Sequence, residues 1–499
     1  MQTPPVPKFE LKQEFTAAGK GRVDALDALI ILLPESALQK RWPDFPYAER
    51  LKNRPASGTD TPAPLRIDLP NTRGTSAVVA FVKTEASTFE LLTLARKALA
   101  KALESEPRDI GLLTPDMNLG QQERVAEAFV AAMSAAVFMP PVFKSPTNEK
   151  PVPASLALLG LAKKLDFSHS LAAAEGNALA RWLSLLPANK LTPTEYRAQL
   201  AVLAKREHWK FQFLGERKLT KLKAGAFLAV SQGSDSRDAG IAHLRYAPPK
   251  SGKHPQAVAL VGKGICYDTG GVNLKSAKSM FGMHADMQGS AVALGTLLAL
   301  TRLKVPFQVD CWLAIARNQI GPKAYTQNEV ITASNGVNIE IVHTDAEGRM
   351  VLADTLALAG NPGPALLMDY ATLTGSCITA LGTRYSGAFC NQAALMAPVM
   401  EAGRASGERV WPFPVDADYD EAIESEVADV KQCIIEGEAD HILAARFLSR
   451  FVPKTMPLVH VDLSAAEHKG GLGHVPGNVT GFGVRFSLDL LLNQKLLSK

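Results

Sequence analysis

The chain has 499 residues, of which 46% are hydrophobic and 21% are charged, and its formal net charge at pH 7 is +5. This length allows two or more domains with sizeable cores, and the composition is ordinary for a globular protein. The small net charge argues against a nucleic-acid-binding protein or a polybasic membrane patch. No apolar run approaches the roughly 18 residues that cross a bilayer, so we expect no membrane segment.

Cysteine usage and the N-terminal segment bear on the location of the protein. The five cysteines are scattered and include no Cys-x-x-Cys pair, so neither a zinc finger nor a disulfide framework is indicated. The first residues lack the apolar stretch of a secretory signal. We therefore expect a reducing, cytoplasmic setting.

The first third of the chain alternates predicted strands and helices after a proline- and charge-rich arm over residues 1–21, which we predict to be loose. Such alternation is typical of an α/β domain. A proline-rich loop is predicted over residues 140–153, and no catalytic cluster is found before it. The predicted strands are 28–33, 76–82 and 109–113, and the predicted helices are 89–103 and 121–138.

The rest of the chain continues this alternation. A helix is predicted over residues 166–186 and ends before Pro187. The next helix is predicted to begin with Thr192 as its N-cap, Pro193 in the first position and Glu195 completing a capping box. Further strands are predicted over 209–214, 226–231, 241–246, 256–261, 307–316, 337–342, 365–369 and 458–463, and further helices over 288–303, 350–358, 393–406, 417–427 and 439–451.

The stretch His-Thr-Asp-Ala-Glu-Gly-Arg, residues 343–349, lies between a predicted strand and a predicted helix. It places Asp345 and Glu347 close to the cation Arg349. In an open α/β sheet, ligands bind beyond the carboxyl ends of the strands. Two carboxylates this close are costly unless a cation lies between them, so the stretch is a candidate metal site.

Other charged residues follow predicted strands in the same half of the chain. The glycine-rich segment 262–271 carries Lys263 and Asp268, and its four glycines indicate a tight turn or a close backbone approach. Lys275 follows this segment, and Asp286 precedes a predicted helix. On successive loops at one side of a sheet, four carboxylates suit two divalent ions that share a water. An ion-pair network is the alternative, although such networks more usually lie on helix faces.

Other catalytic patterns are absent from the sequence. There is no His-Glu-x-x-His, no Gly-x-Ser-x-Gly, no complete dinucleotide fingerprint and no phosphate-binding Gly-Lys-Ser/Thr loop. Cys266 and Cys377 lie near the candidate site but lack an obvious partner, so we interpret them as buried structural thiols.

Several segments together resemble the leucyl aminopeptidase family, the two-metal cytosolic aminopeptidases. Residues 343–349 differ by one residue from the family signature Asn-Thr-Asp-Ala-Glu-Gly-Arg. Residues 262–271, 283–287 and 371–375 resemble other site segments of the family in order and approximate spacing. The resemblance is strong over residues 180–388 and weak elsewhere.

This resemblance implies the fold, activity and assembly of the protein. It implies a smaller N-terminal α/β domain over residues 1–165, a linker helix over 166–190 and a larger C-terminal catalytic α/β domain over 191–499. The larger domain is expected to have a central mixed sheet flanked by helices. The implied activity is the release of N-terminal, leucine-like residues from peptide substrates. The implied assembly is a homohexamer built as a dimer of trimers.

The resemblance also implies the site residues and cofactors. Two divalent ions per subunit, zinc or manganese and also magnesium, are expected, with Asp268 and Glu347 bridging them. Lys263 would bind as a neutral amine, whereas Lys275 would stay charged and stabilise an oxyanion. Arg349 would hold a bicarbonate ion that shuttles a proton. The expected metal ligands are Lys263, Asp268, Asp286, Asp345 and Glu347, and the expected substrate-binding residues are Met283, Thr372 and Gly375.

The sequence departs from the family pattern at four places. Thr269 replaces the usual serine, a mild change, and Arg317 stands where the family commonly has an acid. His343 replaces the signature asparagine, so the hydrogen bonding before Asp345 is expected to differ. The usual Gly- and Ala-rich loop, which lies near the substrate entrance in the family, is replaced by Glu-Ala-Asp-His at residues 438–441. The substrate preference is therefore expected to depend on this loop.

Two other hypotheses stay open at this stage. One is a non-catalytic homologue that binds DNA or acts as a scaffold, which the mild positive charge allows but the intact metal ligands oppose. The other is a two-metal hydrolase that acts on phosphate esters, which the predicted metal chemistry permits but the resemblance opposes.

Overall fold

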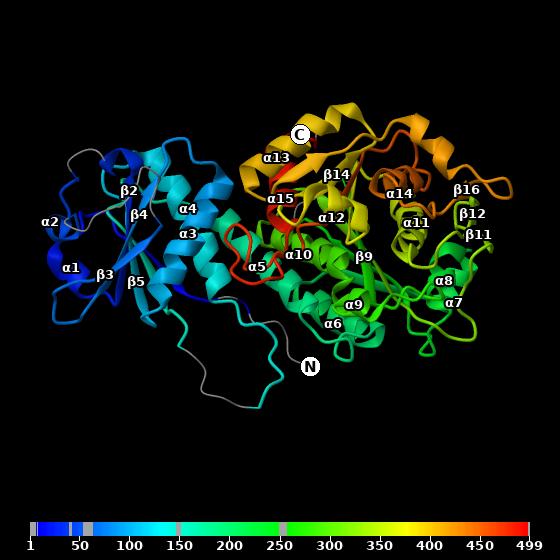
Figure 1. Ribbon diagram of the computed structural model, residues 1–499, viewed down its shortest axis with the longest axis horizontal. Helices are drawn as coiled ribbons and strands as arrows, with labels where there is room; N and C mark the ends of the chain where they lie inside the picture. The colour runs from blue at the N-terminus through cyan, green and yellow to red at the C-terminus, as the bar shows by residue number, and fades with distance from the viewer. Residues whose placement is uncertain are drawn as a thin grey trace. The chain divides into compact units, whose positions relative to one another are not determined.

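A computed structural model describes residues 6, 8–38, 42–52, 63–145, 151–248 and 257–497. The chain forms two compact units (Figure 1). The N-terminal unit contains Pro5–Ala174 and Gly470–Asn478, and the C-terminal unit contains Glu175–Lys469 and Val479–Lys499. Both are α/β, as predicted. Among the helices that the structure describes, none combines the length and apolar character that a bilayer crossing requires.

The N-terminal unit is built on a six-stranded sheet with the order β1-β6-β5-β2-β4-β3. Its neighbouring strands are parallel except at β3, which runs antiparallel to β4. The strands are β1 (Glu10–Gln13), β2 (Ala28–Pro34), β3 (Leu65–Asp68), β4 (Ser76–Val82), β5 (Asp109–Leu113) and β6 (Ser155–Leu159).

The central strand β2 shows why a continuous apolar run forms a buried strand. Successive side chains of a strand point to opposite faces of the sheet. Ile30 and Leu32 belong to the core on one face, whereas Leu29 and Ile31 belong to the core on the other. A strand covered on both faces needs apolar side chains at every position, and this explains why its bounds were predictable.

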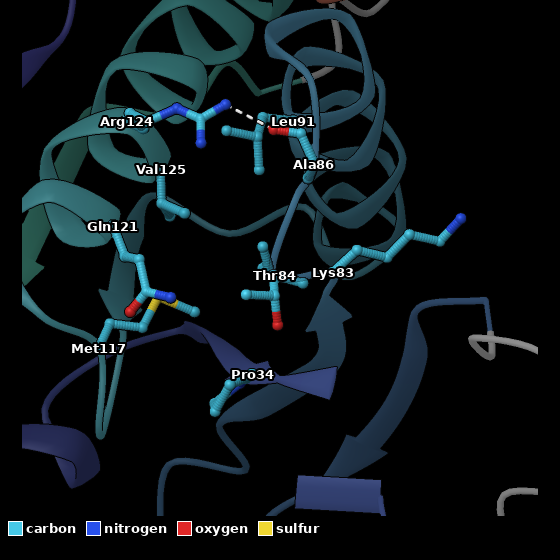
Figure 2. A pocket seen from close by; sticks show the side chains of 10 residues that line it. Pro34, Lys83, Thr84, Ala86, Leu91, Met117, Gln121, Arg124 and Val125 are labelled. Carbon is cyan, nitrogen blue, oxygen red and sulfur yellow. Dashed lines mark hydrogen bonds between the residues drawn. The ribbon is translucent and has the colours of Figure 1, made fainter. Parts of the chain in front are cut away.

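Helices α3 (Thr88–Leu103) and α4 (Leu119–Ala136) share one of these cores and begin with capping boxes, as Ser87 and Glu90 do for α3. Figure 2 shows a hollow near the starts of both helices and the ends of β2 and β4. None of the predicted site residues lines it. Its lining residues are Pro34, Val82, Lys83, Thr84, Ala86, Leu91, Met117, Gln121, Arg124 and Val125.

The prediction of a loose arm over residues 1–21 is wrong in part. The arm contains β1 and the start of α1 (Lys20–Asp24), and β1 pairs in parallel with β6. The sequence Glu-Leu-Lys-Gln has little apolar signal because β1 is an edge strand that is only partly buried. Backbone pairing with β6, rather than side-chain pattern, determines this strand.

The C-terminal unit contains an eight-stranded mixed sheet with the order β15-β14-β17-β13-β9-β10-β8-β7. Its middle strands β17, β13, β9 and β10 are parallel, and antiparallel pairs flank them on both sides. The strands are β7 (Lys210–Gly215), β8 (Gly240–Tyr246), β9 (Ala257–Asp268), β10 (Gln308–Asn318), β13 (Leu366–Ala371), β14 (Ser386–Cys390), β15 (Val410–Pro412) and β17 (Leu458–Asp462).

Helices and a small three-stranded sheet, β11-β12-β16, complete this part of the chain (Figure 1). The small sheet consists of β11 (Val330–Thr332), β12 (Asn338–Glu340) and β16 (Val430–Lys431). The helices are α5 (Ser168–Ser184, which spans the boundary between the units), α6 (Pro193–Arg206), α7 (Glu216–Lys221), α8 (Gly225–Ser231), α9 (Ala277–Met280), α10 (Gln288–Arg302), α11 (Glu347–Gly360), α12 (Gly375–Leu381), α13 (Met396–Ser406), α14 (Asp440–Ser449) and α15 (Val484–Asn493).

Three local predictions in this unit are wrong wholly or in part. The helix predicted over 417–427 is the short 3-10 helix Ala417–Ile423. The apolar run 226–231 forms helix α8, because short apolar runs fit either element and here Asp354 accepts the N–H of Phe227 near the start of the helix at 2.8 Å. The N-cap of α6 is confirmed, since Thr192 accepts the N–H of Glu195. The reciprocal half of the predicted capping box is missing, since the only cap at this helix start is the Thr192 side chain. The buried Glu195 Oε2 has no hydrogen-bond partner among the described residues.

A buried carboxyl group supports the start of the last helix. Glu408 Oε2 accepts the N–H groups of Gly483 and Phe486, both at 2.9 Å, where α15 begins. These bonds satisfy backbone donors that the helix itself leaves free. Burial nevertheless raises the pKa of Glu408 to about 7.

This raised pKa predicts a pH-dependent cost to folding. A carboxyl group with a higher pKa in the folded state binds more protons when folded, so its contribution to stability falls as the pH rises from about 4.5 to about 7. In Glu408→Gln this dependence is lost. The free energy of unfolding of the variant, measured with urea, should gain on the order of 2 kcal/mol relative to wild type between pH 5 and pH 8.

Glu401→Gln on α13, whose side chain is 43% exposed, is the matched control and should follow the wild type between pH 5 and pH 8. Parallel pH profiles for Glu408→Gln and the wild type would contradict the prediction.

Candidate metal centre and active site

Strand β9 carries the first two candidate ligands. The strand continues through Gly262 and Gly264 to Asp268, so the glycine-rich segment does not turn until Gly270, where φ is +85°. Lys263 therefore lies inside the strand and is 3% exposed. The glycines serve two purposes, close approach within the strand and a left-handed turn after it.

The remaining acids reach the site by other routes than predicted. Asp345 and Glu347 follow β12, which belongs to the small sheet and not to the central one. Asp286 follows the short 3-10 helix Met283–Ala285 rather than a strand. The prediction that these acids follow successive strands of one sheet is therefore wrong, because packing between separate layers brings them together.

The structure does bring the candidate ligands together. Carboxylate oxygens of Asp268, Asp286 and Glu347 all lie within 4.8 Å of one another, and all three residues are buried. The Nζ atom of Lys263 lies 2.8 Å from Asp286 Oδ1 and 2.9 Å from Glu347 Oε1. The cluster has the size and the donor atoms of a divalent metal site.

Lys275 and Asp345 extend the cluster toward solvent. The Nζ atom of Lys275 lies 2.8 Å from Asp268 Oδ2 and 2.5 Å from Asp345 Oδ1. The side chains of Lys275 and Asp345 are 15% and 27% exposed, whereas that of Glu347 is 1% exposed. The two lysines therefore occupy a buried and a more accessible part of one charged cluster.

Negative charge is in excess in this cluster, because four carboxylates face two ammonium groups. Burial and repulsion from Asp268 raise the pKa of Asp286 to about 6 and that of Glu347 to about 8, and they also raise the pKa of Asp345. Burial lowers the pKa of Lys263, but the surrounding carboxylates outweigh it and the pKa lies above its ordinary value. The site thus favours additional positive charge.

The donor atoms fit divalent cations. Asp286 Oδ2 and Glu347 Oε2 are buried and have no hydrogen-bond partner among the described residues. Buried acceptors of this kind are costly unless a partner is supplied, and a metal ion would supply one. The expectation that Lys263 binds a metal ion as a neutral amine applies to the site with metal bound, and it stays a prediction.

Residues that were not predicted hold the ligand loops in place. Asn318, at the end of β10, donates to Asp268 Oδ1 at 2.9 Å and to the Thr344 carbonyl at 3.1 Å. Thr344 Oγ1 donates to the Gly270 carbonyl at 2.7 Å. These bonds join β10 to the two ligand loops, and no sequence motif points to them because the partners are far apart in the chain.

His343 makes the local hydrogen bond that an asparagine could make at this position. Its Nδ1 accepts the N–H of Asp345 at 3.2 Å, so the side chain of one residue bonds the backbone two residues on. An asparagine Oδ1 makes the same kind of turn. The replacement therefore keeps the turn that presents Asp345.

Arg349 makes contacts that the sequence did not indicate. The residue is 2% exposed, and its Nη2 donates to both carboxylate oxygens of Asp440 at 2.7 and 2.9 Å. Its Nη1 donates to the Gln432 carbonyl at 3.1 Å. Gln432 also donates to the Ala346 carbonyl and accepts the N–H of His343, so it ties this region to the ligand loop.

Of the predicted substrate-binding residues, Thr372 contacts the cluster directly. Thr372 Oγ1 donates to Asp286 Oδ1 at 2.8 Å, and the Thr372 carbonyl accepts from Lys263 at 2.9 Å. Gly375 is exposed at the start of α12, with open space where a Cβ would lie. Met283 is half-buried in the short helix that precedes Asp286.

The cysteines near the site are buried, as predicted. Burial raises the pKa of Cys377 to about 12 and also raises that of Cys266. All five cysteines are free thiols in buried positions. A buried thiol with a raised pKa is a poor nucleophile.

Comparisons with known proteins agree with this geometry. The family described as cytosol aminopeptidase family, catalytic domain, matches residues 178–488. The probable cytosol aminopeptidase of Synechococcus sp. (strain JA-3-3Ab) is 33% identical over 498 residues, covering 97% of this chain and 95% of the relative. That of Desulfovibrio desulfuricans is 36% identical over 411 residues, covering 79% and 81%.

Solved structures extend the similarity to the fold. A mutant of tomato leucine aminopeptidase superposes with a TM-score of 0.85 at 27% identity, covering 98% of both chains. The bottromycin maturation enzyme BotP in complex with Mn gives a TM-score of 0.78 at 29% identity, covering 94% of this chain and 99% of BotP.

These matches confirm the resemblance, the α/β fold and the metal-dependent aminopeptidase activity expected from the sequence. They give no support to a DNA-binding or scaffolding homologue. Because the similarity spans nearly the whole chain and includes the segments that carry the carboxylate cluster, the chain belongs to the cytosol aminopeptidase family.

Proposed function

We propose that the protein uses two divalent metal ions to release leucine-like N-terminal residues from peptides in the cytoplasm. The observation that carries the proposal is the buried cluster of Asp268, Asp286 and Glu347, whose carboxylate oxygens lie within 4.8 Å of one another. Zinc, manganese and magnesium all accept such ligands. Because BotP was solved in complex with Mn, Mn²⁺ is the first ion to test.

The proposed ligands divide between the two ions. Asp268 and Glu347 would be shared by both ions, Asp345 would help to hold one of them, and Lys263 with Asp286 would help to hold the other. Two buried oxygens without hydrogen-bond partners, Asp286 Oδ2 and Glu347 Oε2, support this set. When bound, the ions lower the pKa of a shared water and polarise the scissile carbonyl.

Lys275 is proposed to stabilise the oxyanion that develops on the substrate. Its ammonium group already lies beside Asp268 and Asp345 and is partly accessible. These carboxylates raise its pKa above the ordinary value even though burial lowers it, so the group carries its charge at neutral pH. A fixed charge aimed at a developing oxyanion is an effective way to lower a reaction barrier.

Met283, Thr372 and Gly375 are proposed to line the pocket for the first side chain. Gly375 contributes space, since no atom lies within 4 Å of the position of a Cβ. Thr372 touches Asp286, so a pocket built here lies directly beside the carboxylate cluster.

The bicarbonate expected beside Arg349 does not fit the residues present. Arg349 Nη2 already donates to both oxygens of Asp440, and Nη1 donates to Gln432. The single positive charge of the guanidinium is therefore balanced by a carboxylate of the chain. We assign no step to bicarbonate.

The first prediction tests the reaction and the role of Lys275. With Mn²⁺ or Zn²⁺, the protein should hydrolyse leucine p-nitroanilide but not its N-acetyl derivative, and a chelator should abolish the activity. In Lys275→Ala, kcat should fall by about 10²- to 10³-fold because the oxyanion loses its cation. Steady-state kinetics measure both effects.

Lys278→Ala, which removes an exposed lysine on the neighbouring helix α9, is the control and should keep full activity. Hydrolysis of p-nitrophenyl phosphate in place of the anilide would favour the phosphate-ester hypothesis. If neither the anilide nor any dipeptide of a panel is hydrolysed with any of these metals, the proposal is contradicted.

The second prediction tests the packing around Lys263. A Cβ at Gly348 would lie 2.7 Å from Lys263 Cε and 2.9 Å from Leu373 Cδ1. Gly348→Ala should displace the Lys263 side chain and weaken Mn²⁺ binding, measured by calorimetry, by about tenfold or more.

Gly360→Ala, at the other end of the same helix, is the matched control because its nearest contact is 3.3 Å from the position of a Cβ. Equal Mn²⁺ affinities for the two variants would argue against Lys263 as a ligand.

The third prediction concerns assembly. We propose a homohexamer arranged as two trimers, as the family resemblance implies. Light scattering coupled to size exclusion should give about six times the chain mass of 53.5 kDa. A stable monomer would contradict the proposal.

A further inference from the structure

Arg349, two residues after the proposed ligand Glu347, forms an ion pair with Asp440. Arg349 is 2% exposed, and Nη2 holds both oxygens of Asp440 at 2.7 and 2.9 Å. A charge-assisted pair of this length in a buried setting is strong and well oriented. The remaining nitrogen, Nε, is buried and has no hydrogen-bond partner among the described residues.

The backbone fixes the position of Asp440. It is the first residue of α14, and Ala439 before it has a φ of +50°. His441, the next residue, donates its N–H to Ser376 Oγ at 2.9 Å and pairs its Nδ1 with the same oxygen at 3.0 Å. The start of α14 is thereby attached to α12, so the carboxylate does not sit on a free loop.

Arg349 also ties this carboxylate to the metal ligands. Arg349 and Glu347 lie in the first turn of α11, and Gln432 bonds both Arg349 and the backbone of Ala346. Asp440 is therefore held against the turn that carries a proposed bridging ligand. Its side chain is 23% exposed, so one side of it remains accessible to water or substrate.

A second anion would be unfavourable here. A bicarbonate at Arg349 would carry a negative charge next to Asp440 and would compete for a guanidinium that is already neutralised. Like charges at contact distance in a buried site disfavour each other strongly. Asp440 thus supplies the counter-charge that a bound anion would otherwise bring to Arg349.

We infer that Asp440 replaces bicarbonate beside Arg349 and is the proton carrier of the hydrolysis, an inference that rests on the proposed function. The aminopeptidase then needs no bicarbonate. Arg349 is a positioning residue, because it acts by holding the Asp440 carboxylate.

The proton transfers balance as follows. As the oxygen of the attacking water forms its bond to the peptide carbonyl carbon, one water proton moves to a carboxylate oxygen of Asp440. The same proton then moves to the amide nitrogen as the C–N bond breaks. One water is consumed, the new carboxyl and amine termini leave, and the Asp440 carboxylate is restored.

The test compares hydrolysis of leucine p-nitroanilide by the full-length protein with Mn²⁺, in buffer freed of carbon dioxide, with and without potassium bicarbonate. The wild type should show equal rates in both buffers. Asp440→Ala should lose about a hundredfold in kcat without bicarbonate and regain part of it when bicarbonate is added. Asp440→Asn, which keeps the shape but not the charge, should lose kcat to a similar extent.

Asp420→Ala is the matched control, because Asp420 makes a similar pair with Arg446 rather than with Arg349. It should keep the wild-type rate and the wild-type indifference to bicarbonate. Stimulation of the wild type by bicarbonate, or full activity of both Asp440 variants without it, would overturn the inference.

A binding measurement separates this inference from the proposed function. Carbon-13 NMR of labelled bicarbonate should show no binding to the metal-loaded wild type and measurable binding to Asp440→Ala. If the wild type binds bicarbonate, the inference fails whatever the activity. If the wild type hydrolyses no peptide and binds no bicarbonate, the proposed function fails, and the proton-carrier role of Asp440 fails with it. The conclusion that Asp440 takes the place of bicarbonate beside Arg349 would still stand.

Discussion

The excess of buried negative charge is the constraint on which the C-terminal unit depends. Four carboxylates converge with two lysines, and two like charges about 4 Å apart repel by roughly 4 kcal/mol at the effective dielectric of a protein. The raised pKa values of Asp286 and Glu347 express this repulsion. A divalent cation relieves it directly, so the same feature that costs folding free energy creates affinity for metal.

Close backbone packing keeps this charge in place. A Cβ at Gly262 would lie 2.5 Å from the Cα of Ser290, so α10 can approach β9 only because Gly262 has no side chain. Gly348 on α11 likewise leaves room for the Lys263 side chain, because a Cβ at Gly348 would lie 2.7 Å from Lys263 Cε. Two glycines in different segments thus set the spacing of the layers that carry Lys263, Asp286 and Glu347. The packing of these layers, and not the loops alone, therefore determines the positions of the candidate ligands.

The accuracy of the sequence-based predictions follows from where the determining interactions lie. The bounds of β4 and β5 match the predicted ranges, because an apolar run between turn residues is a local signal. Helix α8 was predicted as a strand because its identity depends on packing and on Asp354, far along the chain. The candidate ligands were found because they lie in recognisable motifs. Asn318, Gln432 and Asp440 were not predicted as site residues, because only tertiary structure shows what they contact.

The departures from the family pattern at His343 and Asp440 have different physical consequences, although Gln432 bonds both the backbone of His343 and Arg349, the partner of Asp440. At position 343 a histidine replaces the asparagine of the motif, but its side chain still accepts the N–H of Asp345. The ligand loop therefore keeps its turn. Asp440 adds a negative charge where Arg349 would otherwise need one from solution. An arginine buried to 2% exposure requires a counter-charge, and supplying it within the chain removes the entropy lost in capturing a free ion. Arg349 therefore keeps the identity that the motif gives it, while its counter-ion comes from the chain instead of from solution. The residues that contact the motif thus determine how Arg349 acts.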